Sequence, residues 1–237
     1  DPVTELNKRA PAAPAAESGV SSDIEVIVDD NNPIHGVTGC DRYVARAIHG
    51  FDPTNHTPNW MRRRLIRAGM RSISLAVDVT NYVMLDLGQP MHAYDLDKIE
   101  GPIVVRRAAE GEKLTTLDGK EHDLSVEDLL ITDSPDGNRG SRILGIAGVM
   151  GGLYGEVTAD TKNILLEAAH FDSVSIARSA RRHKIPSEAS RRFERGVDAQ
   201  LQPAAAQMAA ELLTKFGNGE PSGHPTDVNT TMYRRPI

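Results

Sequence analysis

Residues 103–133 read IVVRRAAEGEKLTTLDGKEHDLSVEDLLITD, and this stretch predicts the fold class. Apolar and polar side chains alternate in it over short runs, which is the period of a half-buried strand. Turn signals separate the runs, among them Asp118-Gly119, a pair typical of tight hairpins. We therefore expect antiparallel hairpins in the middle of the chain.

Strands are also predicted on both sides of this stretch. Residues 23–29 (DIEVIVD) alternate in the same way, and residues 41–47 (DRYVARA) are predicted to pair with them after a glycine-containing turn. Residues 142–152 (RILGIAGVMGG) are predicted to form a buried strand that runs into a glycine turn. Residues 163–171 (NILLEAAHF) are predicted to form another strand.

Helices are predicted to flank these strands. Residues 58–68 and 75–87 each precede a glycine, and two further helices are expected from near residue 187 to 196 and over residues 202–216. Because strands fill the middle and helices flank them without regular alternation, the predicted class is α+β, with a central, mostly antiparallel sheet region flanked by helices.

The predicted domain spans residues 23–216. Residues 1–22 are interpreted as a linker or the end of a preceding module, because residues 7–22 are rich in Ala, Pro and Ser and lack a helical or strand period. Residues 217–237 return to loop composition and are interpreted as a linker and the start of a following module.

The amino-acid composition excludes several functional classes of protein. The 237 residues are 39% hydrophobic and 25% charged, which is ordinary globular usage. A formal net charge of -6 argues against a surface that is wholly a nucleic-acid clamp, although local basic patches are compatible with it. The lone Cys40 has no partner for an internal disulfide, and no His and Cys cluster predicts a metal site. Because no stretch resembles a membrane span or a signal peptide, we expect a cytoplasmic protein with no membrane partner.

Four segments concentrate polar residues suited to chemistry. The first contains Thr80 and Asn81, followed by Pro90 and His92 after a helix and a turn. His92 has an ordinary pKa near neutral pH, so it could orient or deprotonate a water molecule, or simply bond a backbone carbonyl. The second is the glycine-rich run at residues 145–152, whose backbone N–H groups could bind an anion or a developing oxyanion, or only form a tight turn. It lacks the Lys and Ser/Thr of a nucleotide-binding P-loop.

The third segment contains Glu167. In an alternating strand its carboxylate shares a face with Leu165 and Ala169, where an ionised group is costly unless a donor or an arginine meets it. The fourth, residues 178–196, holds six arginines and one lysine against two glutamates. This charge suits phosphate or tRNA binding, while a salt-bridged helical face is the alternative. The candidate RNA-binding residues are Arg178, Arg181, Arg182 and Arg191.

Together these segments resemble the editing region of the bacterial phenylalanyl-tRNA synthetase beta subunit. The resemblance extends over about residues 23–216 and is carried, in this order, by RSISLAVDVTNYVMLDLGQPMHAYDLDKI, KLTTLDGKEHDL, GIAGVMGG, NILLEAAHFD and RRHKIPSEASRRFERGVD. It implies a tRNA-editing domain in a heterotetramer of two alpha and two beta subunits. It assigns ATP-dependent aminoacylation to the alpha subunit, so ATP and magnesium are expected only for the complete synthetase and no cofactor is expected in this chain.

The same resemblance implies what the site does. Such a region hydrolyses tyrosine mistakenly attached to the acceptor end of tRNA(Phe), which is needed because an apolar pocket rejects an added hydroxyl only about a hundredfold. By resemblance Glu167 accepts the tyrosine hydroxyl. His92 and Asn81 could position the attacking water, and N–H groups around Gly151 could bind the oxyanion or hold the amino acid. The other residues of the implied substrate pocket are Thr80, Pro90, Gly152, Ser187 and Ala189. The rival interpretations are a non-catalytic tRNA-binding or subunit-assembly module and a free-standing deacylase.

Overall fold

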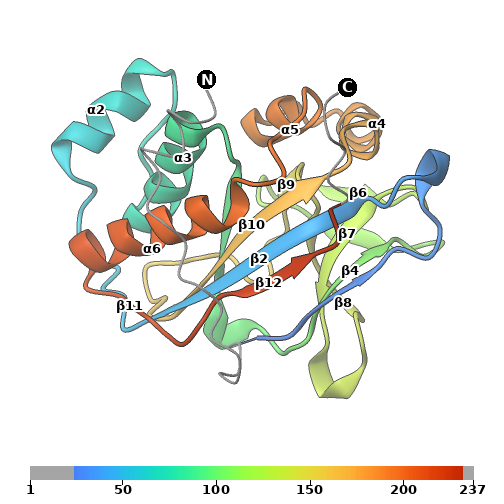
Figure 1. The fold of residues 1–237 in the computed structure, drawn as a ribbon, viewed down its shortest axis with the longest axis horizontal. Helices are drawn as coiled ribbons and strands as arrows, with labels where there is room; N and C mark the ends of the chain where they lie inside the picture. The colour runs from blue at the N-terminus through green and yellow to red at the C-terminus, as the bar shows by residue number, and fades with distance from the viewer. Residues whose placement is uncertain (1–23, 232–237) are drawn as a thin grey trace.

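The computed structural model describes residues 24–231 and combines two five-stranded sheets, a two-stranded hairpin and surrounding helices (Figure 1). The predicted α+β class, with mostly antiparallel strands, is confirmed. The predicted segment at residues 1–22 and the last residues of the segment at 217–237 lie outside the described part.

The two large sheets form the body of the fold. The first has the order β1-β4-β7-β8-β9 and consists of β1 (Val26–Asp29), β4 (Ile103–Arg107), β7 (Leu129–Asp133), β8 (Arg142–Ile146) and β9 (Met150–Gly151). The second has the order β11-β2-β10-β3, with β12 also paired to β2, and consists of β2 (Cys40–His49), β3 (Met91–Asp95), β10 (Ile164–Phe171), β11 (Glu220–Pro221) and β12 (Thr226–Asn229). The predicted hairpin at Asp118-Gly119 joins β5 (Lys113–Thr115) to β6 (Glu121–Asp123).

The predicted pairing of residues 23–29 with residues 41–47 is wrong. β1 runs parallel to β4, with Val26 opposite Ile103, whereas β2 pairs antiparallel with β10. The connection from β1 to β2 contains a short 3-10 helix, Ile34–Gly36, and carries the chain from one sheet to the other. Both strands bury apolar side chains in one core, because an alternating pattern specifies a buried face and does not specify a partner strand.

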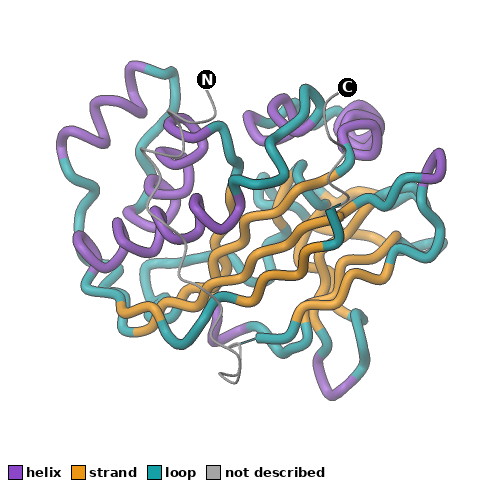
Figure 2. The backbone as a smooth tube through the Cα atoms, in the orientation of Figure 1, coloured by secondary structure: helices purple, strands orange, loops and turns teal. Residues whose placement is uncertain are grey.

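The described residues form five α-helices: α2 (Asn59–Arg67), α3 (Leu75–Leu87), α4 (Ser173–His183), α5 (Glu188–Phe193) and α6 (Gln202–Gly217). The helices predicted at residues 58–68, 75–87 and 202–216, and the one beginning near 187, are confirmed. α3 packs against α6, and α6 packs on β2 and β10, so these helices cover one face of the second sheet (Figure 2). None of the helices within residues 24–231 is both long and apolar enough to cross a membrane.

Helix α4 has no counterpart among the predicted helices. Asp172 caps its N-terminus by accepting a hydrogen bond of 2.8 Å from the Ser175 N–H. Ile176 and Ala180, one turn apart, are buried in the core. The arginines on the rest of the helix give the segment a charged composition that hides this narrow apolar stripe.

Strand β10 lies in the second sheet between β2 and β3, and its two faces look onto different cores. Leu165 and Ala169 belong to the core between the two sheets, whereas Leu166 packs in the core under the helices. Because side chains alternate along a strand, Glu167 points to the same side as Leu165 and Ala169. The fold therefore places a carboxyl group in the apolar layer between two sheets.

Candidate functional site

The site is built around Glu167, whose side chain is buried with 6% of the residue exposed. On one side it lies opposite Ala45 of β2, and on the other it lies opposite His92 of β3. The hydroxyl groups of Tyr43 and Tyr94 donate hydrogen bonds to its Oε2 atom, at 3.0 Å and 2.7 Å. Two phenols, rather than an arginine, therefore meet the carboxylate, and both use the same oxygen.

The environment of Glu167 raises its pKa to about 7. The principal cause is burial, which disfavours the charged form, while the hydrogen bonds from Tyr94 and Tyr43 partly oppose it. Burial also raises the pKa of both phenols, so they remain protonated donors at neutral pH. The carboxyl group can thus exchange a proton near neutral pH, and each protonation state can bond a ligand hydroxyl.

Glu167 lines a cavity of about 150 Å³, referred to below as the Glu167 cavity. Its walls include Tyr94, Pro90 and His92 from the region of β3, residues 145–151, and Ala189 of α5. A cavity of roughly this volume accommodates one benzene ring. The geometry therefore suits a single aromatic side chain with its polar end toward the carboxyl group.

His92 forms the wall between Glu167 and the glycine-rich run. Its ring packs edge-on against Tyr94, with 4.5 Å between ring centroids. A Cβ atom on Gly151 would lie 2.7 Å from His92 Cε1 and 2.8 Å from Nε2, so the imidazole fills the space that any side chain at this position would need. Residue 151 is thus a glycine because the histidine approaches its backbone closely.

The predicted titration of His92 near neutral pH is wrong. Burial lowers the pKa of His92 to about 4, because removing the ring from water disfavours the imidazolium. The imidazole is therefore neutral at neutral pH and is a weak proton acceptor. Its position suits orienting a water molecule better than storing a proton.

Four of the predicted pocket residues do not line the Glu167 cavity. Thr80 and Asn81 lie on α3, where the Thr80 hydroxyl donates to the carbonyl of Val77 at 2.8 Å. Ser187 caps α5 by accepting a hydrogen bond of 3.0 Å from the Ser190 N–H. Gly152 is buried, and its N–H donates to the carbonyl of Leu144 at 2.7 Å. The roles predicted for these four residues stay predictions.

Several backbone N–H groups of the glycine-rich run already donate hydrogen bonds within the protein. The N–H groups of Ala147 and Val149 donate to the carbonyls of Leu129 and Ile146, at 2.9 Å and 3.0 Å. Together with Gly152, they form the turn that joins β8 to β9. An oxyanion role is therefore limited to amides outside these three.

The sequence did not single out Tyr43 and Tyr94, which both touch Glu167. Tyr94 follows His92 by two residues on the same strand, so the period of a strand places the two side chains on one face. Tyr43 comes from β2, a distant segment, and only the register of β2 against β10 brings it near Glu167. The position of Tyr94 could therefore be inferred from the local sequence pattern, whereas no local pattern indicated Tyr43.

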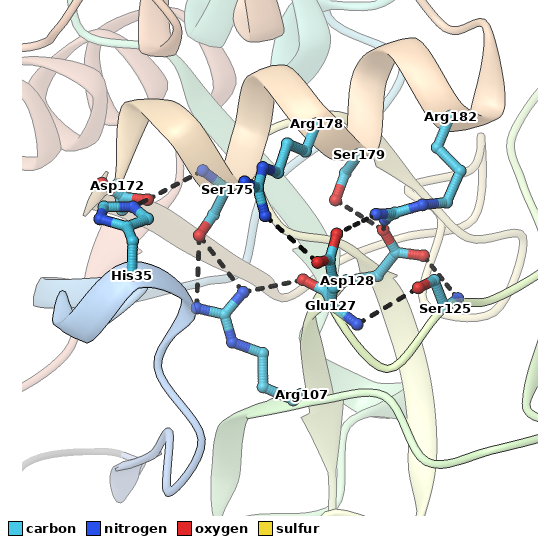
Figure 3. Close-up of polar contacts among 10 residues, drawn as sticks. All are labelled: His35, Arg107, Ser125, Glu127, Asp128, Asp172, Ser175, Arg178, Ser179 and Arg182. Carbon is cyan, nitrogen blue, oxygen red and sulfur yellow. Dashed lines mark hydrogen bonds and ion pairs between the residues drawn. The ribbon is translucent and has the colours of Figure 1, made fainter.

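Two of the arginines predicted to bind RNA, Arg178 and Arg182, hold α4 to the loop before β7 (Figure 3). Arg178 pairs with Glu127 at 3.2 Å, and Arg182 pairs with Glu127 and with buried Asp128. Burial opposes ionisation of Asp128, but hydrogen bonds, among them one of 2.6 Å from Ser179, keep its pKa below the usual value. These contacts fit the salt-bridged alternative for Arg178 and Arg182.

The other two predicted arginines are more exposed. The side chain of Arg181 is 76% exposed and lies 4.0 Å from Glu194, and that of Arg191 is 55% exposed and lies 3.4 Å from Glu188. Such exposed pairs contribute little to stability. Contact of any of these four arginines with RNA stays a prediction.

A family model described as the B3/4 domain matches residues 39–218. The chain belongs to the B3/4 domain family. This B3/4 domain chain is 81% identical over 237 residues to the phenylalanine–tRNA ligase beta subunit of Bifidobacterium longum, covering 100% of the chain and 27% of that relative. It is 55% identical over 195 residues to the beta subunit of Streptomyces avermitilis, covering 81% of the chain and 23% of that relative. The chain thus spans about a quarter of the length of these curated relatives.

A solved structure, an N-terminal fragment of the phenylalanyl-tRNA synthetase beta subunit from Pyrococcus horikoshii, is also similar to this B3/4 domain. The similarity covers 75% of the chain and 54% of the fragment, with a TM-score of 0.44 and 18% sequence identity.

Proposed function

We propose that this B3/4 domain is the editing module of a phenylalanine–tRNA ligase beta subunit and hydrolyses tyrosyl-tRNA(Phe). The observation that carries the proposal is the carboxyl group of Glu167 on the wall of a ring-sized cavity. Tyr43 and Tyr94 both bond Oε2, and no described residue donates a hydrogen bond to Oε1. Oε1 is therefore the atom we assign to the hydroxyl of a bound tyrosine.

This arrangement selects tyrosine over phenylalanine through the energy of a buried polar group. A site that hydrogen-bonds a substrate hydroxyl can reject the analogue without it by roughly 10⁴-fold or more, because the site's own polar group is then left unpaired. Phenylalanine in the Glu167 cavity would desolvate the carboxyl group further and return no hydrogen bond. The selectivity is thus opposite to that of an apolar pocket for phenylalanine.

Hydrolysis requires a water molecule held beside the ester. We assign this role to His92, whose neutral ring lines the same cavity as Glu167 and packs on Gly151. With a pKa of about 4, the ring positions water and is a poor general base at neutral pH. Asn81 and Thr80 lie on α3 outside the cavity lining, so we assign them at most an indirect effect on the ester.

The proposal also covers the localisation, the partners and the cofactors of the domain. The domain would act in the cytoplasm within an assembly of two alpha and two beta subunits and would bind the acceptor end of tRNA(Phe). ATP and magnesium would serve aminoacylation by the complete synthetase, with no cofactor assigned to this chain. The rival function is tRNA binding or subunit assembly without catalysis.

The test is deacylation of preformed tyrosyl-tRNA(Phe) and phenylalanyl-tRNA(Phe) by the complete synthetase that contains this chain. The proposal predicts rapid release of tyrosine and slow release of phenylalanine. The rival predicts tRNA binding with no acceleration of either hydrolysis above the rate in buffer. Equal hydrolysis of the two esters would show that the domain is an esterase and would reject the proposed selectivity for tyrosine.

A further inference from the structure

Gln89 is a buried polar residue that the proposed mechanism does not use. It lies between the end of α3 and the start of β3, is 0% exposed and does not line the Glu167 cavity. Its Nε2 atom donates hydrogen bonds to the carbonyls of Pro90, at 2.8 Å, and Ala169, at 2.9 Å. Its Oε1 atom accepts a hydrogen bond of 2.9 Å from Nε2 of Gln202, the first residue of α6. The amide therefore joins the start of β3 to the end of β10 and to the start of α6.

The bond to Ala169 continues the pairing of β3 with β10 where the backbone of β3 has no donor. In the register of these two strands, Met91 lies opposite Ala168. The residue before Met91 is Pro90, which has no N–H group and so cannot donate to β10. The side chain of Gln89 supplies a donor to the next carbonyl of β10. Gln89 thus extends the contact between the two strands beyond the last backbone pair.

The two strands that Gln89 joins carry the candidate site. His92 of β3 follows Pro90 by two residues and lies opposite Glu167 of β10. β10 is paired with β2 along its whole length, whereas β3 lies at the edge of its sheet. Because an edge strand is held by fewer contacts, loss of the Gln89 amide should displace the start of β3 more than β10. His92 would then move, and Glu167 would stay in place.

Gln202 fixes the direction in which the Gln89 amide faces. The side chain of Gln202 is buried, and its Nε2 atom donates to Gln89 Oε1 and, at 2.9 Å, to the carbonyl of Asp198. An amide side chain donates through its nitrogen and accepts through its oxygen. With a donor held against Oε1, the Nε2 atom of Gln89 must face the carbonyls of Pro90 and Ala169. The start of α6 therefore sets the orientation on which the bond to β10 depends.

We propose that Gln89 is a positioning residue for ester hydrolysis, which holds His92 of β3 in place relative to Glu167 of β10. The role rests on the proposed function, in which Glu167 binds the substrate side chain and His92 orients the water. A misplacement of about 1 Å caused by a residue remote from the chemistry can lower the rate about 100-fold. Because Gln89 acts on His92 and not on Glu167, its loss should slow hydrolysis of the tyrosyl and phenylalanyl esters by the same factor.

The test is deacylation of tyrosyl-tRNA(Phe) and phenylalanyl-tRNA(Phe) by the complete synthetase with Gln89→Met, which keeps the side-chain length and removes its hydrogen bonds. The matched control is Thr132→Val, since Thr132 is also fully buried and its hydroxyl donates to the carbonyl of Val104 at 2.7 Å in the first sheet. We expect Gln89→Met to lower kcat for both esters about tenfold or more, with KM and the ratio of the two kcat/KM values within about twofold of wild type. Thr132→Val should lower the urea midpoint of unfolding and leave kcat unchanged.

Gln202→Met is a second variant, which serves if Gln89→Met does not fold. It leaves the Gln89 amide in place but allows it to rotate, so it should lower kcat for both esters by a smaller factor. If Gln89→Met folds, adding Gln202→Met to it should have no further effect on kcat, because Gln202 acts through Gln89.

The outcomes separate this positioning role from the proposed function. A folded Gln89→Met or Gln202→Met enzyme with the kcat of wild type would overturn the role and leave the proposed function standing. An equal loss of kcat in Thr132→Val would also overturn it, because any buried hydrogen bond would then have the same effect. A collapse of the ratio between the two esters in Gln89→Met would overturn it too, since Glu167 would have moved. Absence of deacylation by wild type would reject the proposed function and the positioning role together.

Discussion

Glu167 of β10 lies opposite His92 of the neighbouring strand β3. Folding shifts the pKa values of these two residues in opposite directions. The pKa of Glu167 rises on folding from 4.5 to about 7, so the stability it contributes is fully present below pH 4.5 and is lost as the pH rises through 7. The pKa of His92 falls from 6.5 to about 4, so the stability it contributes is present above pH 6.5 and is lost as the pH falls through 4. In wild type the two contributions oppose each other over most of this range.

The difference in the free energy of unfolding between a variant and wild type should isolate the pH dependence contributed by the residue that was substituted. The pKa changes from 4.5 to about 7 for Glu167 and from 6.5 to about 4 for His92, and each change corresponds to about 3 kcal/mol. The free energy of unfolding of Glu167→Gln, relative to wild type, should therefore rise by about 3 kcal/mol as the pH increases from 4.5 to above 7. That of His92→Gln should fall by a similar amount as the pH increases from 4 to above 6.5.

The assay is urea unfolding of the three proteins at half-unit intervals from pH 4 to pH 8. The difference between each variant and wild type removes the contributions of all other titrating groups, provided that they are unaffected by the substitution. Parallel profiles for wild type and Glu167→Gln would refute the reasoning, because they would mean that the buried carboxyl group does not change its proton affinity on folding.

Three further substitutions follow from the geometry. Gly151→Ala should slow deacylation of tyrosyl-tRNA(Phe) about tenfold or more, since the added methyl group must displace the His92 ring at a cost of about 1–3 kcal/mol, and its effect on unfolding in urea should largely vanish in a His92→Ala background. Ala189→Trp should abolish deacylation by filling the Glu167 cavity while the unfolding midpoint stays near that of wild type, and retained deacylation would count against the placement. Arg182→Ala should lower the free energy of unfolding by about 1–3 kcal/mol, because buried Asp128 loses a charged partner. Arg181→Ala should change it by less than about 0.5 kcal/mol. Equal effects of the two substitutions in urea unfolding would contradict the structural role assigned to Arg182.

Local sequence patterns were sufficient to predict most of the helices and strands. They were insufficient to predict which strands pair. The alternation in residues 23–29 correctly indicated strand β1, and the glycine at residue 88 correctly indicated the end of α3. The partner of β1 was not predictable, because a strand of four residues fits any neighbour that covers its apolar face. Helix α4 was missed because its buried stripe is narrow and its surface is rich in arginine.

The candidate site shows the same division between local and long-range information. The strand period was enough to place Glu167 on an apolar face and to require a donor for it. The identity of the donors depends on Tyr43 from another strand, and the low pKa of His92 depends on burial by elements distant in sequence. The composition of residues 178–196 was compatible with phosphate binding and with a salt-bridged helical face, and the carboxylates that meet Arg178 and Arg182 come from residues 127 and 128, outside that segment.

The central claim is that Glu167 reads the tyrosine hydroxyl, and the most direct test compares Glu167→Ala with wild type in the complete synthetase. The measurement is the ratio of kcat/KM for deacylation of tyrosyl-tRNA(Phe) to that of phenylalanyl-tRNA(Phe), with unfolding curves to show that the variant is folded. The account predicts that the variant loses its preference, because the tyrosine hydroxyl no longer has a buried acceptor and phenylalanine no longer leaves one unpaired. A folded variant with the selectivity of wild type would contradict the claim.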